Sequence, residues 1–275
     1  MDDRLDILIP TCNRTTALAV TLTALAAQHL PLRIVISDQS DDEGALHTPE
    51  LQGVMRYLCQ RHHDVALHRH WPRRGMAEQR AFLLAQARAA HCLFLDDDVI
   101  IDAGLVARMH AMLLRQQCGF VGSALHGLSH VDDHRPEEEA IAFWEDKVHP
   151  ETVTPDSPAW RRHRLHNAAN LLHVQRRLEA GGDAPLLYRV AWVGGCVMYD
   201  TAMLRDCGGF DFWEALPATH CGEDVLAQLR VMAKYGGCGL LPSGAYHLEL
   251  PTTLPDRRVN APFLLGLGQT TPDLL

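Results

Sequence analysis

The chain has 275 residues, of which 47% are hydrophobic and 21% are charged, and its formal net charge is -9. A chain of this length and composition can bury a sizeable core, so we expect one large domain, or one domain with an added subdomain, rather than disorder. The acidic balance argues against nucleic acid as the main ligand, because phosphate backbones are bound by an excess of Lys and Arg.

Targeting signals and cysteine chemistry are not evident in the sequence. No apolar run approaches the roughly 18 residues that a membrane span requires, and the opening MDDRLDILIP carries acids where a signal peptide would carry Lys or Arg. We therefore expect a cytoplasmic protein. The eight cysteines form no C-x-x-C pair, and several lie within apolar runs, which indicates reduced, buried thiols rather than disulfides or a zinc knuckle.

The first 125 residues alternate short apolar runs with longer segments of helical pattern. The apolar runs are 6–10, 32–38, 65–68, 92–98 and 119–125, and the helical patterns are 15–28, a stretch ending at 61, 75–90 and 103–116. This β-α alternation predicts an α/β fold with a mostly parallel, Rossmann-like sheet flanked by helices.

Polar residues end three of the predicted strands. They are the segment 11–14, Asp38 and the three consecutive acids 96–98. Because ligands of open parallel sheets bind beyond the carboxyl ends of the strands, we expect these groups to converge on one rim.

The alternation stops between residues 126 and 187, where histidines, acids and prolines cluster. This segment is expected to be an insertion or a flank of the site. His126, His130, Asp132 and His134 could in principle bind zinc, but their spacing matches no standard ligand pattern, so we expect a solvent-exposed loop.

Within this segment, residues 160–178 have the pattern of a basic amphipathic helix. Leu165, Ala168 and Leu172 share one face, and five arginines surround them, namely Arg161, Arg162, Arg164, Arg176 and Arg177. The helix could rest on an anionic membrane, giving peripheral contact at its inner face. It could also dock on its own domain with arginines paired to the glutamates of 136–139, and we favour docking.

The regular pattern resumes with an apolar strand at 188–200. A helix is expected to begin near Glu223 and to end at the two glycines 236 and 237, and the proline-containing tail after His247 is expected to be irregular. We therefore divide the chain into 1–125, 126–187 and 188–275.

The three acids of 96–98 suggest a cation site. In an extended segment, residues two apart point the same way, so Asp96 and Asp98 can face one ligand. Mg²⁺ and Mn²⁺ favour one or two carboxylates together with phosphate oxygens. The alternative is a helix N-terminal turn leading into 103–116, in which the acids interact with the helix dipole.

The order of the short motifs identifies a family resemblance. ILIPTCNR, VISDQSDD, RRGMAEQRAFLL, LFLDDDV, GGF and GEDV follow one another between about Ile7 and His247. This set resembles the family 2 glycosyltransferases of the GT-A fold. The resemblance implies a nucleotide-sugar-binding half at 1–125 and an acceptor-binding half, or subdomain, at 188–275.

The resemblance implies a nucleotide pocket, a metal and its ligands. The nucleotide-binding residues would be Pro10, Thr11, Arg14, Asp38, Gly75, Arg80, Asp96 and Asp97. Asp98 would bind Mn²⁺ or Mg²⁺, which neutralises charge on the departing nucleoside diphosphate, and His247 would complete the metal shell.

Simpler interpretations of several of these residues stay open. Thr11 and Asn13 could cap the following helix, Asp38 could begin a turn, Arg80 could be a solvated helix residue, and His247 could be an ordinary packed or surface histidine.

The GEDV motif supplies the expected base. The resemblance assigns Asp224 as the general base that accepts the proton of the acceptor hydroxyl, with Glu223 supporting it. Acids in a first helical turn also interact favourably with the helix dipole without any catalytic role. On the acceptor side we expect Trp192, Gly194, Gly195, Trp213 and His220, although Trp192 could equally belong to the core, an interpretation that we slightly favour.

The resemblance implies a metal-dependent, inverting glycosyltransferase that moves a sugar from a nucleotide-diphosphate sugar to a glycan or lipid-linked acceptor. UDP or dTDP as the nucleotide is expected from the family alone. The chain lacks the Q-x-x-R-W signature of processive synthases, so transfer of single sugars is expected. A sugar nucleotidyltransferase is less suitable because PTCNR lacks the glycines of a phosphate-binding loop. A catalytically silent nucleotide-sugar or glycan-binding protein is the third alternative, but binding alone would not require Asp224.

Overall fold

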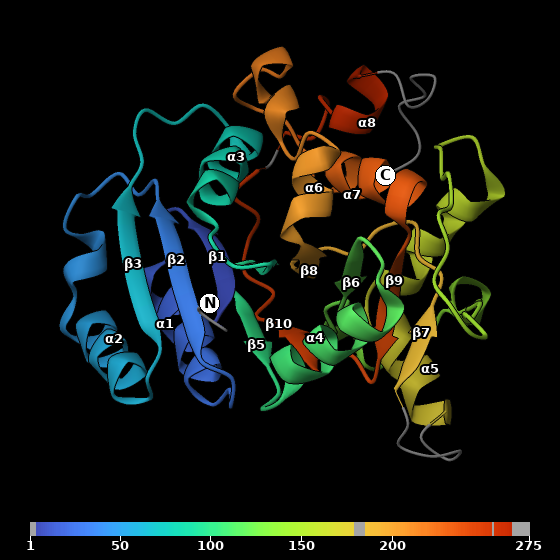
Figure 1. Cartoon of the computed structure of the whole chain (residues 1–275), viewed down its shortest axis with the longest axis horizontal. Coiled ribbons are helices and arrows are strands. Elements are labelled where there is room, and N and C mark those ends of the chain that lie inside the picture. Colours follow the sequence, from blue (N-terminus) through green and yellow to red (C-terminus); the bar gives the residue numbers. More distant parts are fainter. Residues whose placement is uncertain (1–3, 179–184, 255, 266–275) are drawn as a thin grey trace.

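The structure, a computed structural model, describes residues 4–178, 185–254 and 256–265. Within these residues an eight-stranded sheet has the order β3-β2-β1-β4-β8-β6-β9-β7, and β10 pairs with β5 in a small second sheet (Figure 1). The strands are β1 (Leu5–Thr11), β2 (Leu32–Asp38), β3 (Asp64–Arg69), β4 (His91–Leu95), β5 (Val99–Ile101), β6 (Phe120–Gly122), β7 (Leu186–Tyr188), β8 (Cys196–Asp200), β9 (Gly237–Leu241) and β10 (Ala245–His247).

The sheet confirms the predicted Rossmann-like α/β class. β1 pairs in parallel with β2 and β4, β2 with β3, and β6 with β9. β8 runs antiparallel to both β4 and β6, and β7 runs antiparallel to β9. The parallel half coincides with the β-α alternation of the sequence, because parallel neighbours require a crossover connection.

Helices cover both faces of the sheet. They are α1 (Thr15–Ala26), α2 (Pro49–Gln60), α3 (Met76–Gln86), α4 (Leu105–Gln116), α5 (Asn170–Leu178), α6 (Thr201–Asp206), α7 (Glu223–Tyr235) and α8 (Ala261–Leu264). Short 3-10 helices are η1 (Ala45–His47), η2 (Leu128–His130), η3 (Pro136–Glu138), η4 (Pro158–His166) and η6 (Asp211–Ala215).

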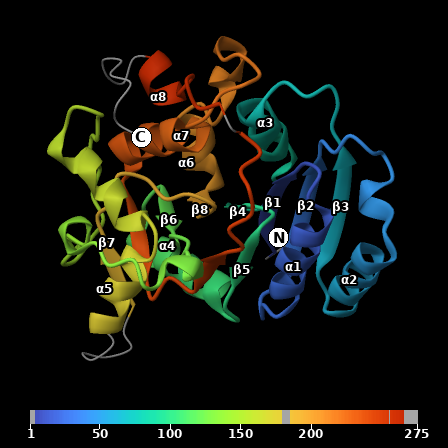
Figure 2. The same cartoon turned by 180° about the vertical axis from the view of Figure 1, so that it is seen from behind.

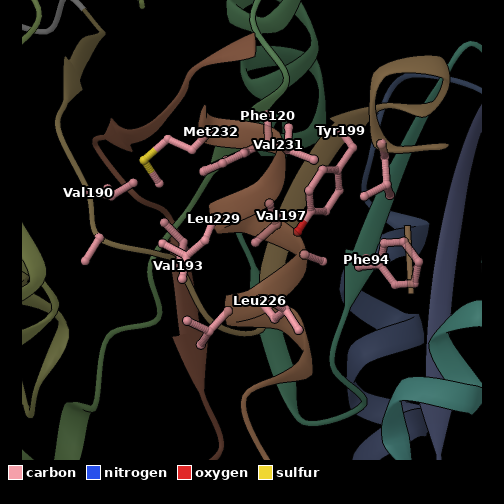
Figure 3. Packing of buried hydrophobic residues seen from close by; sticks show 14 of the residues in the cluster. Phe94, Phe120, Val190, Val193, Val197, Tyr199, Leu226, Leu229, Val231 and Met232 are labelled. Atoms are coloured by element: carbon pink, nitrogen blue, oxygen red, sulfur yellow. The ribbon is translucent and has the colours of Figure 1, made fainter. Parts of the chain in front are cut away.

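Two hydrophobic clusters hold these layers together. Ile7 and Ile9 of β1 face a cluster with α1, α2 and α4, whereas Leu8 between them faces a cluster with α3, α6 and α7. Successive side chains of a strand point to opposite faces, which explains this division. In Figure 3, Phe94 and Tyr199 lie in the second cluster beside side chains of α7 such as Leu226.

The small second sheet places the C-terminal segment beside the three acids. β10 runs antiparallel to β5, and His247 pairs with Val99, the residue that follows Asp98. Beyond β10 the chain crosses the middle of the molecule towards α8 (Figure 2). The expected irregular tail is therefore a segment that lies across the carboxyl ends of β1 and β4.

The middle segment differs from the expectation of one continuous helix over 160–178. η4 ends at His166 and α5 begins at Asn170, because Asn167 is extended and Ala168 has a φ of 49°. The expected boundary between 187 and 188 falls inside β7, which joins the edge of the main sheet.

Two arginines of this segment form ion pairs within the protein. Arg177 pairs with Glu139, one of the glutamates expected to receive it. Arg162 instead places both terminal nitrogens 2.8 Å from the carboxylate of Glu151. These contacts agree with docking of this segment on its own domain.

Gln228 of α7 provides a test of how the loop before β8 is held. This fully buried amide accepts a hydrogen bond from the N–H of Val193 at 2.8 Å and donates one to its carbonyl at 2.7 Å. We expect Gln228→Ala to lower the free energy of unfolding by about 2 kcal/mol, because both backbone groups of Val193 lose their partner. Urea denaturation measures this loss, and the exposed Gln60→Ala serves as control. Equal stability of the two variants would contradict this account of the loop.

Candidate active site

The predicted strand ends meet at one cavity. Thr11 at the end of β1 donates a hydrogen bond of 2.6 Å to Asp97 after β4, which joins the two strand ends directly. A cavity of about 460 Å³, called here the first cavity, opens beside them. Expected residues that line it are Pro10, Thr11, Arg14, Arg80, Asp96, Asp97, Asp98, Trp192, Gly194, Glu223, Asp224 and His247.

The three consecutive acids lie between two strands and not at a helix N-terminus. β5 follows Asp98 directly, and α4 begins only at Leu105. The alternative in which these acids interact with the dipole of the helix at 103–116 is therefore wrong. The turn between β4 and β5 directs the three carboxylates to three different sets of partners.

Asp97 is buried, with an exposed fraction of 6%. It accepts the hydrogen bond from Thr11, and Arg14 lies 3.5 Å away. Burial raises its pKa to about 6, although Thr11 and Arg14 act in the opposite direction. Asp97 therefore joins the carboxyl ends of β1 and β4, and it also lines the first cavity.

Asp98 is paired with two donors. Its Oδ2 atom lies 2.6 Å from Arg14 and 3.4 Å from Nε2 of His247. Burial raises the pKa of Asp98, but the hydrogen bonds and charges of His247 and Arg14 outweigh it, so the net pKa lies below its usual value. The hydrogen bond with Asp98 raises the pKa of His247 in turn.

Arg80 links the remaining acid to the GEDV motif. Its guanidinium donates to Asp96 at 3.1 Å and to Glu223 at 3.0 Å, and its side chain is only 8% exposed. The interpretation of Arg80 as a solvated helix residue is therefore wrong. A buried cation between two carboxylates positions the start of α7 against the end of β4.

Glu223 and Asp224 form the first turn of α7, after Gly222 with a φ of 76°. Glu223 is 5% exposed and burial raises its pKa. Burial, followed by the charge of Glu223, raises the pKa of the half-buried Asp224 to about 7. A carboxyl group with this pKa can exchange a proton at neutral pH, as a general base requires.

A second cavity adjoins the first. It has a volume of about 600 Å³ and is lined in part by His163, His166 and Asn167 of the middle segment. The two cavities share Asp96, Trp192, Gly194, Asp224, His247, Leu250 and Arg257. Asp224 therefore lies in the wall that the two cavities share.

Trp192, Gly194 and Gly195, the residues expected on the acceptor side, line the second cavity. Trp192 is half-buried, and its ring stacks on His163 with centroids 4.8 Å apart and an interplanar angle of 13°. Gly194 faces open space, whereas a Cβ on Gly195 would lie 2.5 Å from Leu125. Trp192 thus belongs both to the core and to the cavity wall.

Asp38 lies at the expected rim but outside the lining of either cavity. It is 3% exposed, and its carboxylate accepts hydrogen bonds from the N–H of Ser40 at 2.8 Å and from Arg69 at 3.0 Å. The contact with Ser40 agrees with a role in the turn after β2.

His220 and Gly75 form a packing unit that caps α3. His220 is 1% exposed, donates from Nδ1 to Pro217 at 2.7 Å and accepts at Nε2 from the N–H of Ala77 at 3.1 Å. Gly75 has a φ of 106°, and a Cβ there would lie 2.5 Å from His220. The two residues therefore support the helix that carries Arg80, and neither lines a cavity.

Trp213 and the possible helix caps complete the placement of the expected residues. Trp213 packs against the core with Arg74 over its ring, outside both cavities. The side chain of Thr11 donates to Asp97, and the side-chain amide of Asn13 donates to Asp41. The N-cap of α1 is Arg14, so the interpretation of Thr11 and Asn13 as caps of this helix is wrong.

Several residues of the cavities were not predicted from the sequence. Arg257 lines both cavities, and Thr252 and Leu254 of the same tail line the first. Arg14 donates to the carbonyl of Pro251, which fixes the tail across the first cavity. The basic pair in PDRR was a possible signal for Arg257, but nothing in the tail's periodicity connected it with the strand ends.

The acids and histidine of the first cavity are suited to a hard divalent cation. Asp96 and His247 have side chains that are 36% and 35% exposed, and Asp98 lines the same cavity with its Oδ2 atom 3.4 Å from His247. Carboxylate oxygens with one imidazole fit Mn²⁺ or Mg²⁺ beside a diphosphate. Nδ1 of His247 accepts a hydrogen bond from the N–H of Glu249, so the proton of a neutral ring is on Nε2. Nε2 can bind a metal only after that proton moves to Nδ1, which ends the contact with Glu249.

The mostly parallel sheet, whose strand ends carry these acids opposite an acidic helix N-terminus, has the architecture of the GT-A fold. Residues 6–151, more than half of the chain, match the family described as Glycosyl transferase family 2. The chain belongs to glycosyltransferase family 2.

Solved structures agree with this fold. TarS 1–349 of S. aureus is 18% identical with a TM-score of 0.55, over 89% of this chain and 60% of that one. Its complex with UDP-GlcNAc has 17% identity and a TM-score of 0.56, over 91% and 60%. The mannosyltransferase PcManGT of Pyrobaculum calidifontis, in complex with GDP-Man and Mn²⁺, has 17% identity and a TM-score of 0.51, over 86% and 56%. The chain thus spans less than two thirds of the length of these structures.

A comparison with curated proteins returned no match. Among the helices within residues 4–178, 185–254 and 256–265, none combines the length and the apolar character that crossing a membrane demands.

The pKa of Asp224 predicts a pH-dependent effect on stability. Because its pKa is raised from 3.8 to about 7, the folded state binds the proton more tightly than the unfolded chain. The ionised side chain therefore destabilises the fold increasingly between about pH 4 and pH 7, and fully above pH 7. Asp224→Asn should raise the melting temperature by a few degrees near pH 8 and much less near pH 4. Differential scanning calorimetry measures both values, with the exposed Glu43→Gln as control. An equal effect of Asp224→Asn at the two pH values would contradict the raised pKa.

Proposed function

We propose that this family 2 glycosyltransferase transfers single sugars from a nucleotide-diphosphate sugar to a glycan or lipid-linked acceptor, with inversion at the anomeric carbon. The supporting observation is the place of Asp224 in the wall shared by the two cavities, together with its pKa of about 7. In this proposal the first cavity binds the donor and the second binds the acceptor.

Asp224 acts as the general base. Its carboxylate accepts the proton of the acceptor hydroxyl as the acceptor oxygen bonds to the anomeric carbon and the bond from that carbon to the diphosphate oxygen breaks. Attack from the second cavity on a donor in the first inverts the configuration. Glu223 stays paired with Arg80, so its charge favours proton uptake by Asp224 without competing for the acceptor.

The donor site combines strand-end groups with the C-terminal tail. Arg14 and Arg257 are cationic groups of the first cavity that suit a diphosphate, and Pro10 and Thr11 line its floor. The structures with UDP-GlcNAc, UDP and GDP-Man bound show that proteins of this fold accept uridine and guanosine donors. We propose UDP or dTDP for this chain, with Asp38 contacting the base edge once Arg69 moves away.

A divalent cation belongs to the proposed donor site. Asp98, Asp96 and His247 would hold Mn²⁺ or Mg²⁺, and the ion would stabilise the negative charge of the leaving diphosphate. Arg14 pairs with Asp98 in the structure, so this guanidinium holds the carboxylate in place and shares its charge with the site. The proposed cellular role is polysaccharide biosynthesis in the cytoplasm, and a lipid-linked acceptor would bring residues 160–178 to the inner face of the membrane.

Replacing the base tests the mechanism. We expect Asp224→Asn to lower the rate of nucleoside diphosphate release, measured with a panel of donors and acceptors, by roughly 100- to 10,000-fold. Donor binding should persist, seen as the same rise in melting temperature with the nucleotide. In the native protein, kcat/KM should rise with pH through about pH 7, because the base must be ionised. A near-native rate for Asp224→Asn would refute the assignment, and Glu43→Gln controls for the loss of a carboxylate elsewhere.

Removal of the metal tests the second part of the proposal. Chelation with EDTA should abolish turnover, and Mn²⁺ or Mg²⁺ should restore it. Asp98→Asn should weaken the stabilisation of the fold by Mn²⁺ together with the donor nucleotide, because an amide is a poorer ligand for a hard cation. Full activity in EDTA would show that Arg14 and Arg257 alone suffice for charge neutralisation.

A further inference from the structure

A cluster of metal-ligating side chains lies in the middle segment, outside both cavities. His134 follows η2, Glu139 follows η3 and His173 lies in α5, and their ligand atoms all lie within 4.8 Å of one another. His134 is exposed, whereas Glu139 and His173 are only 8% and 6% exposed. Three possible metal ligands from separate segments therefore lie close together. Two of them are buried, and the third is at the surface.

His173 is oriented as metal-bound histidines are. Its Nε2 atom donates to the carbonyl of Val131 at 2.9 Å, and its Nδ1 atom lies 3.3 Å from Oε1 of Glu139. A neutral ring that donates from Nε2 turns the lone pair of Nδ1 towards the carboxylate. Two acceptors at this distance repel one another unless a proton or a metal ion lies between them. A backbone carbonyl on the outer nitrogen is the usual partner of a ligating imidazole.

Glu139 has one oxygen available for a cation. Its Oε2 atom pairs with Arg177, whereas Oε1 faces His173. Arg177, whose side chain is 58% exposed, occupies Oε2 and leaves Oε1 in contact with His173 alone among these two residues. The separation of 3.3 Å between Oε1 and Nδ1 also equals that of two ligands about 2.0–2.1 Å from a tetrahedral Zn²⁺.

His134 supplies the third donor. Its ring stacks on that of His173 with centroids 4.2 Å apart and an interplanar angle of 17°. Since His134 is exposed, rotation of its side chain can turn a ring nitrogen towards the other two ligands without disturbing the core. Water would complete the four-coordinate shell at the exposed side.

We propose that His134, Glu139 and His173 bind one divalent transition-metal ion, best fitted by Zn²⁺. Two imidazoles and one carboxylate favour Zn²⁺ or Co²⁺ over Mg²⁺, which prefers oxygen ligands. The ion joins the loop after η2 to α5, and the chain just before α5 contributes Asn167 and Ala168 to the second cavity. Metal binding therefore stiffens the acceptor side of the protein, separately from any metal at the donor site.

Metal titration of the purified protein tests this site. After dialysis against a chelator, isothermal titration with Zn²⁺ should show tight binding that survives in Asp98→Asn, which removes the donor-site ligand. Co²⁺ should give visible absorption bands of a tetrahedral site. His134→Ala and Glu139→Gln should each weaken Zn²⁺ binding by at least about tenfold, whereas the exposed His29→Ala on the opposite half should not.

The outcomes separate this proposal from the glycosyltransferase activity. His134 is exposed, so His134→Ala should fold as the native protein does, and an unchanged melting temperature without metal would confirm this. Zn²⁺ binding that His134→Ala and Glu139→Gln leave unchanged, or that Asp98→Asn alone removes, would overturn the proposed site. Absence of Zn²⁺ binding to the native protein would overturn it as well. None of these results bears on sugar transfer.

Discussion

The buried guanidinium of Arg80 is the contact on which the geometry of the active site depends. It holds Asp96 at the end of β4 and Glu223 at the start of α7 at hydrogen-bond distance. Without this cation the buried Glu223 would lose its partner, and removing one member of a buried ion pair costs about 3–5 kcal/mol. The same burial that makes Arg80 necessary raises the pKa of Asp224 to about 7. Burial therefore determines both the need for the contacts of Arg80 and the raised pKa of Asp224.

Three adjacent carboxylates acquire three different roles because the turn from β4 to β5 separates them. Asp96 pairs with Arg80, Asp97 is bonded by Thr11, and Asp98 is bonded by Arg14. Burial dominates at Asp97 and raises its pKa, whereas donors dominate at Asp98 and lower its pKa. Local environment, rather than residue type, decides which carboxylate is structural and which is available to a cation.

The second half of the chain extends the sheet and contributes residues to both cavities. β8 extends the sheet from β4 in the antiparallel sense, and the loop before it presents Trp192 and Gly194 to both cavities. The middle segment contributes His163 and His166 to the lining of the second cavity. Proteins of this fold with 17–18% identity differ in their donors, as their complexes with UDP-GlcNAc and GDP-Man show.

The sequence alone determined the α/β class, the meeting of strand ends and the acids at 96–98, because these follow from periodicities of neighbouring residues and from strand polarity. Only the tertiary structure decided burial and partners. It placed His220 beneath α3 rather than in a cavity, paired Asp38 with Arg69, and brought Arg257 of the irregular tail to Asp224. These outcomes depend on packing between segments far apart in the chain, and local patterns carry no information about the desolvation and charge pairing that such packing imposes.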